Sequence, residues 1–185
     1  MSEALEGIPW SWVLIRGSGI AAWLVLTAVV AWGLTLRLLR DRRTSASIPR
    51  LMSLHRWLGS IALALVIVHM GLLLIDPYLP FTIVEILVPF AAPWRSLAVA
   101  LGTIAFWLIV PVWALARMRS RWGDRWFLRA HVLAYAAWPL ATAHYVLAGT
   151  DALAAWSLAL LVAGTSVVTV LLIALASARP AEVSR

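Results

Sequence analysis

The sequence contains no cysteine and no lysine. Without cysteine the protein cannot form a disulfide, a thiolate-ligated metal site, an iron–sulfur cluster or the covalent attachment of a c-type haem. Charge is also scarce, because charged residues make up 12% of the chain and hydrophobic residues 63%. A soluble domain carries roughly 25% charged residues. The composition therefore excludes an ordinary soluble domain and predicts a protein that lies in a lipid bilayer.

The net charge of +7 comes from arginine alone, which occurs fifteen times. A basic protein can bind nucleic acid, but here the arginines cluster in short segments between long apolar runs. This placement is typical of membrane topology, in which basic loops stay on the inner side. We therefore expect membrane lipid, and not nucleic acid, to be the partner of this charge.

Five apolar runs are long enough to cross a hydrocarbon core of about 30 Å, namely residues 20–36, 57–75, 97–116, 131–147 and 153–176. Most arginines lie between the first and second runs and between the third and fourth. The positive-inside rule then puts the N-terminus outside and the C-terminus inside. We predict an all-α integral membrane bundle of five transmembrane helices. Its membrane domain, residues 18–178, lies between an outer segment, 1–17, and a cytoplasmic tail, 179–185.

Three shorter signals complete this prediction. Residues 82–90 are apolar but too short to cross, so we expect a short interfacial helix on the outer side. Ser47 and Asp124 stand where helix N-caps are expected, just before the second and fourth spans. Both of these spans then run from inside to outside and are parallel.

All four histidines lie in or next to these two spans: His55 and His69 in the second, His131 and His144 in the fourth. Spacings of 14 and 13 residues correspond to roughly 20 Å along a helix. In parallel helices His55 is level with His131, and His69 with His144. Two facing pairs of neutral nitrogen ligands result, stacked across the membrane, and the simplest occupant is two haems.

Three alternatives to haem ligation stay open for the histidines at this point. A single intramembrane histidine is often a hydrogen-bonding residue between helices. A non-haem copper, zinc or iron site would use imidazole too, although it normally needs further ligands. Titratable histidines could also conduct protons. The main rival to a cytochrome is therefore a haem-free transporter or proton pathway.

The 13-residue spacing of His131 and His144 does not by itself put both rings on the same helix face. At about 100° per residue, 14 residues return to within about 40° of the starting face, whereas 13 residues leave an offset of about 140°. Pro139 lies between His131 and His144, and an interior proline kinks a helix. We expect the distortion at Pro139 to turn His144 back into the bundle.

Several short segments carry a resemblance to a known family: LHRWLG at 54–59, HMG at 69–71, VPFAAPW at 88–94, RAH at 129–131, and His144 followed by AGTD at 148–151. Together they resemble the ferric reductase-like transmembrane domain. That family includes the membrane parts of ferric reductases and NADPH oxidases. It also includes the haem-binding membrane subunit of the periplasmic methionine sulfoxide reductase system.

The resemblance implies two b-type haems, one held by His55 and His131 on the inner side and one by His69 and His144 on the outer side. Two imidazoles fill both axial positions of a haem, which suits single-electron transfer. The resemblance thus implies an oxidoreductase component that carries electrons across a bacterial-type cytoplasmic membrane. The sequence ends at Arg185 without a flavin-binding region or a glycine-rich dinucleotide fingerprint. We therefore expect a separate flavoprotein or a quinol as donor, and ferric iron, oxygen or a periplasmic redox protein as acceptor.

Haem propionates are anions, so arginines near the histidines are candidate partners. Arg56 directly follows His55, Arg50 is close by, and Arg95 lies on the outer side. We predict Arg56 and Arg50 at the inner haem and Arg95 at the outer one. The alternative for each is anchoring at the membrane surface.

Glycines and tryptophans inside the spans give two further predictions. Gly59, Gly71 and Gly102 could leave room for a haem plate, although close helix packing is the commoner reason for such glycines in membranes. Trp138 and Trp107 lie near mid-membrane, where they could relay electrons or simply pack in the core.

Overall fold

The computed structural model describes residues 10–39 and 48–178, and the secondary structure within them is helical, with no strand. The helices are α1 (Trp10–Leu38), α2 (Ile48–Leu74), α3 (Ile83–Leu87), α4 (Ser96–Arg117), α5 (Arg119–Trp122), α6 (Asp124–His131), α7 (Leu133–Ala148) and α8 (Ala155–Ser177). Four of them, α1, α2, α4 and α8, are long and apolar enough to cross a membrane. The all-helical prediction is confirmed.

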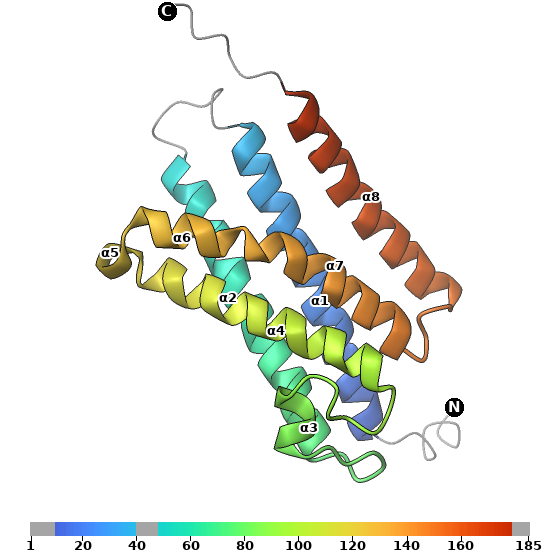
Figure 1. The fold of residues 1–185 in the computed structure, drawn as a ribbon. Helices are drawn as coiled ribbons and strands as arrows, with labels where there is room; N and C mark the ends of the chain where they lie inside the picture. Colours follow the sequence, from blue (N-terminus) through green and yellow to red (C-terminus); the bar gives the residue numbers. More distant parts are fainter. Residues whose placement is uncertain (1–9, 40–47, 179–185) are drawn as a thin grey trace, which may run out of the picture.

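The fourth predicted span, residues 131–147, is divided. α6 ends at His131, and α7 has 16 residues, fewer than the about 20 that a straight span needs. Figure 1 shows α6 and α7 following one another along one line. The prediction of five full-length spans is therefore supported for four helices, and α6 with α7 forms the remaining, interrupted element.

The interruption between α6 and α7 lies at Val132. The Tyr135 amide there donates to the Val132 carbonyl at 3.1 Å, which is the three-residue pattern of a tighter turn. α7 continues through Pro139 without a break in the helix. The distortion expected at Pro139 is therefore not found, and the local tightening lies seven residues before the proline. A tighter turn adds rotation per residue, which turns His144 toward the face of His131.

Two helix pairs dominate the packing. α1 lies along α2, and α4 lies along α7, whereas α2 and α7 make little backbone contact with each other. α8 packs mainly on α1 (Figure 1). The bundle therefore consists of two helical hairpins side by side, α1 with α2 and α4 with α7. The histidine-bearing helices α2 and α7 face each other across the interface between the hairpins.

The short helix predicted within residues 82–90 is α3. Thr82 and Glu85 form a capping box, since each side chain accepts a hydrogen bond from the backbone of the other residue. Ile86 is buried in a small cluster with Phe81 and Ala92. These contacts fix the chain between α2 and α4 at one end of the bundle.

One of the two predicted helix caps, at Asp124, differs from the prediction. α6 begins at Asp124 with Gly123 at its N-cap, and no side chain caps it. Asp124 instead accepts a hydrogen bond from Arg119 Nε at 2.5 Å, and this guanidinium holds the pKa of the exposed carboxyl below its usual range. Ser47, the other predicted cap, lies outside the described residues, as do the tail 179–185 and the first nine residues.

Candidate cofactor site at two histidine pairs

The structure brings the four histidines together in the two pairs expected from their spacing. The ring centres of His55 and His131 are 6.1 Å apart, with 68° between the ring planes. Those of His69 and His144 are 6.3 Å apart, with 75° between the planes. Each pair takes one ring from α2 and one from α6 or α7, so the two histidine-bearing helices run parallel.

The spacing within each pair matches one metal atom between two imidazoles. Two metal–nitrogen bonds of about 2 Å, with about 1 Å from each nitrogen to its ring centre, separate the ring centres by about 6 Å. The observed 6.1 and 6.3 Å fit this requirement. Rings in direct hydrogen-bond contact through their nitrogens would be closer to each other.

The outer pair is oriented by backbone carbonyls. His69 Nδ1 lies 2.8 Å from the Ile15 carbonyl, and His144 Nδ1 lies 2.7 Å from the Ala98 carbonyl. A carbonyl oxygen only accepts, so Nδ1 carries the proton in both rings. The lone pair is then on Nε2, which is the tautomer that a histidine needs to bind a metal.

The inner pair is held differently. Within the described residues, Nδ1 of His55 and Nδ1 of His131 are buried and make no hydrogen bond. The Phe127 ring packs beside His131, with ring centres 5.2 Å apart and planes tilted by 34°. Packing, and not hydrogen bonding, therefore orients these two rings.

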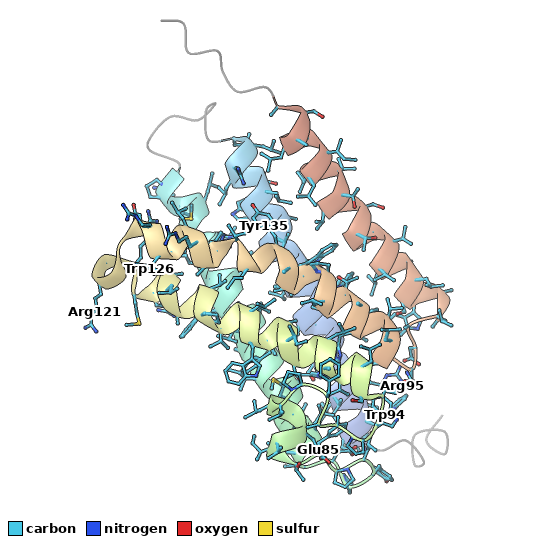
Figure 2. All side chains as sticks on the ribbon, viewed as in Figure 1. Glu85, Trp94, Arg95, Arg121, Trp126 and Tyr135 are labelled. Carbon is cyan, nitrogen blue, oxygen red and sulfur yellow. The ribbon has the colours of Figure 1, made fainter. Side chains whose placement is uncertain are left out.

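The candidate propionate partners lie in different settings. Arg56 and Arg50 are exposed on α2, at the end of that helix near the inner pair. Arg95 donates from one guanidinium nitrogen to the Leu147 carbonyl at 2.7 Å and lies over the Trp94 ring. Figure 2 shows Arg95 and Trp94 at the end of the bundle opposite to Arg121. Arg95 thus ties the start of α4 to the last turn of α7.

The three glycines considered for haem clearance separate into two groups. A Cβ atom placed on Gly59 or Gly71 would meet no atom within 4 Å, so both positions are open. A Cβ on Gly102 would lie 2.8 Å from His144 Nδ1. Gly102 therefore makes room for a histidine ring, and clearance for a haem stays a prediction for Gly59 and Gly71.

The two mid-membrane tryptophans both donate hydrogen bonds between helices. Trp107 donates to the Leu87 carbonyl at 2.8 Å, which connects α4 to α3. Trp138 donates to Thr27 Oγ1 at 3.0 Å, which connects α7 to α1. Both hydrogen bonds connect helices, although the Trp107 side chain is 48% exposed.

Helix α1 contacts both histidines of α2, and the spans and motifs of the sequence did not indicate this contact. Gly19 and Gly33 of α1 lie against His69 and His55. The signal in the sequence was a shared spacing, because Gly19 and Gly33 are 14 residues apart, as are His55 and His69.

The family model described as "Ferric reductase like transmembrane component" matches residues 18–142. This range covers more than half of the chain and includes His55, His69 and His131. The chain belongs to this family. Membership is consistent with histidines at matched depths, because the family transfers electrons across membranes and typically binds haem.

Together with the four long apolar helices, membership makes this a multi-pass membrane protein. No curated protein and no solved structure gives a significant match.

Proposed function

We propose that the protein is a di-haem b-type cytochrome that carries electrons across a bacterial-type cytoplasmic membrane. The observation that carries the proposal is the spacing of two histidine pairs, 6.1 and 6.3 Å between ring centres, at two depths along the same helices. His55 and His131 would hold the inner haem, and His69 and His144 the outer one. A haem held by two imidazoles would supply single-electron transfer.

The number of protein ligands supports haem over a bare metal ion. Tetrahedral and octahedral ions need three or more protein ligands in most sites. In the part of the chain that the structure describes, no group of three or more His, Asp or Glu side chains could hold a metal. A haem supplies four nitrogens itself and asks the protein for two, which is what each pair offers.

The residues around the pairs suit the rest of a haem. Arg56 and Arg50 are charge partners for the propionates of the inner haem, and Arg95 for those of the outer haem. A guanidinium has five N–H donors, so the single bond from Arg95 to Leu147 leaves further donors for a propionate. Gly59, four residues after His55 on the same helix, leaves an open position beside the inner pair.

The direction and partners of electron transfer follow from the same proposal. His55 and His131 would hold the haem that accepts electrons from a separate flavoprotein or from a quinol. His69 and His144 would hold the haem that faces the acceptor, which would be ferric iron, oxygen or a periplasmic redox protein. Within the family, the haem-binding subunit of a sulfoxide reductase system is the role that suits this chain most closely.

The test is an absorption spectrum of the purified protein, oxidised and reduced with dithionite, together with pyridine haemochrome quantitation. We expect two b-type haems per chain. His69→Ala should remove the outer haem and leave about one haem per chain, because His55 and His131 stay intact. Val68→Ala, which changes a half-exposed neighbour on α2, should retain both. A folded wild-type protein without haem would overturn the proposal in favour of a transporter or proton pathway.

A further inference from the structure

Three of the four histidine rings rest against a glycine of a neighbouring helix. A Cβ on Gly19 of α1 would lie 3.0 Å from His69 Cε1, and one on Gly33 would lie 3.1 Å from His55 Cε1. On α4, a Cβ on Gly102 would lie 2.8 Å from His144 Nδ1. Carbon atoms in ordinary contact are about 3.5–4.0 Å apart. A methyl group at any of these positions must therefore displace the ring.

Two of these glycines stand one helical turn after the carbonyls that face the rings. Ile15, whose carbonyl accepts from His69, precedes Gly19 by four residues. Ala98, whose carbonyl accepts from His144, precedes Gly102 by four. Residues four apart lie on one face of a helix. Carbonyl and glycine thus form a single seat, in which the carbonyl orients Nδ1 and the glycine admits the ring edge.

The glycine part of this arrangement recurs on the same helix, where Gly33 lies against His55. Nδ1 of His55 makes no hydrogen bond to any described residue, so this seat lacks the carbonyl. Gly19 and Gly33 are 14 residues apart. Fourteen residues return to within about 40° of the same helix face. One face of α1 therefore carries both seats for α2.

We infer that Gly19, Gly33 and Gly102 are positioning residues for the haem ligands, and that each acts on one haem only. Gly19 and Gly102 act on the outer haem through His69 and His144, and Gly33 acts on the inner haem through His55. The inference rests on the proposed function. Its physical basis is that the partner of Nδ1 fixes the tautomer and direction of a ligating ring.

His131 differs from the other three ligands. Its Nδ1 makes no hydrogen bond to any described residue, and none of the described glycines would contact its ring through a Cβ. The outer haem thus has two seated ligands and the inner haem one. We expect the outer haem to be retained longer than the inner one in the wild-type protein.

The experiment compares Gly19→Ala, Gly33→Ala and Gly102→Ala in the full-length, haem-loaded protein in detergent. Gly17→Ala is the matched control for Gly19→Ala, because it lies on the same helix and its Cβ would meet no atom within 4 Å. The measurements are transfer of haem to excess apomyoglobin, and the low-spin haem signals in electron paramagnetic resonance. These signals report the angle and strength of the axial ligands and do not depend on activity.

We expect Gly19→Ala and Gly102→Ala to weaken binding of the outer haem about 10–100-fold, as losses of ligand-orienting contacts usually do, and to change its signal alone. Gly33→Ala should do the same to the inner haem, and Gly17→Ala should match the wild type. The inference would be overturned if Gly19→Ala and Gly17→Ala lost haem to apomyoglobin at the same rate and gave the same low-spin signals in a protein that holds two haems. A wild-type protein without haem would instead overturn the proposed function.

A measurement on the wild type covers the case in which a variant fails to fold. In the reduced, diamagnetic protein labelled with ¹⁵N-histidine, we expect hydrogen-bonded Nδ1–H groups on His69 and His144. The inner pair should lack them. Four equivalent imidazoles in this spectrum would contradict the seats.

Discussion

At the scale of single residues, the four histidines share one proposed role, haem ligation, but have different surroundings. His69 and His144 donate to backbone carbonyls, whereas His55 and His131 keep buried Nδ1 atoms without a hydrogen bond to any described residue. Hydrogen bonding to Nδ1 raises the basicity of an imidazole ligand. A more basic ligand favours the ferric state, so in the proposed cytochrome this contact would by itself lower the potential of a haem held by His69 and His144.

Replacing Arg56 with Ala should lower the midpoint potential of the inner haem. A positive charge beside a propionate favours the reduced haem, and removing it favours the oxidised one. An exposed charge pair is worth up to about 1 kcal/mol, which corresponds to about 40 mV for one electron. Redox titration should show a smaller shift at the outer haem. Arg121→Ala, an exposed arginine in α5, is the control, and a shift of equal size there would assign Arg56 to membrane anchoring.

At the scale of elements, a reciprocal set of hydrogen bonds joins α1 to α7 at mid-membrane. Trp23 donates to Thr142 and Trp138 donates to Thr27, each at 3.0 Å. Each threonine hydroxyl donates in turn to the carbonyl of the tryptophan on its own helix. These four residues tie the two hairpins together between the levels of the two histidine pairs.

Thr27→Val should therefore destabilise the protein more than a threonine change elsewhere in the same helix. It removes the acceptor of Trp138, and such interhelical hydrogen bonds contribute about 0.6 kcal/mol on average and up to about 1.7 kcal/mol. The measurement is the free energy of unfolding in mixed micelles. Thr35→Val is the control, because the Thr35 hydroxyl donates to Ala31 in its own helix. Equal losses for the two variants would contradict a role for these bonds in joining the hairpins.

The interrupted span shows where local sequence signals were insufficient. Pro139 is the only strong helix breaker between His131 and His144, and the prediction followed its intrinsic preference. The helix instead tightens at Val132 and continues through the proline. α7 stays helical through Pro139 because it packs against α4 and α1. The hydrophobic pattern of residues 131–147 does not indicate these contacts.

At the scale of the whole molecule, the bundle consists of ligand helices and supporting helices. α2 and α7 carry three of the histidines, and α6 carries the fourth. α1 supports α2, and α4 supports α7 (Figure 1). The supporting helices provide the glycines and carbonyls against which the rings rest. α8 packs on α1, where a Cβ on Gly164 would lie 2.8 Å from the Trp23 ring.

The orientation in the membrane can be tested directly, because the chain has no native cysteine. Ser120→Cys lies at the exposed α5 turn, and Leu153→Cys lies in the connection before α8, where Leu153 is 80% exposed. The arginine distribution predicts that a membrane-impermeant maleimide labels Leu153→Cys in intact spheroplasts and labels Ser120→Cys only after lysis. The reverse pattern would invert the topology and exchange the inner and outer histidine pairs.

The sequence by itself determined the membrane setting, most of the spans and the pairing of the histidines. These properties depend on local hydropathy and on distance along a helix, and both can be read from residue spacing. Only the tertiary structure decided which neighbouring helix seats each ring, where the fourth span tightens, and that Gly102 admits a histidine. Those features depend on which helix faces pack together. The 14-residue spacing that Gly19 and Gly33 share with His55 and His69 is compatible with such a contact, but a spacing within one segment does not specify which helix lies beside it.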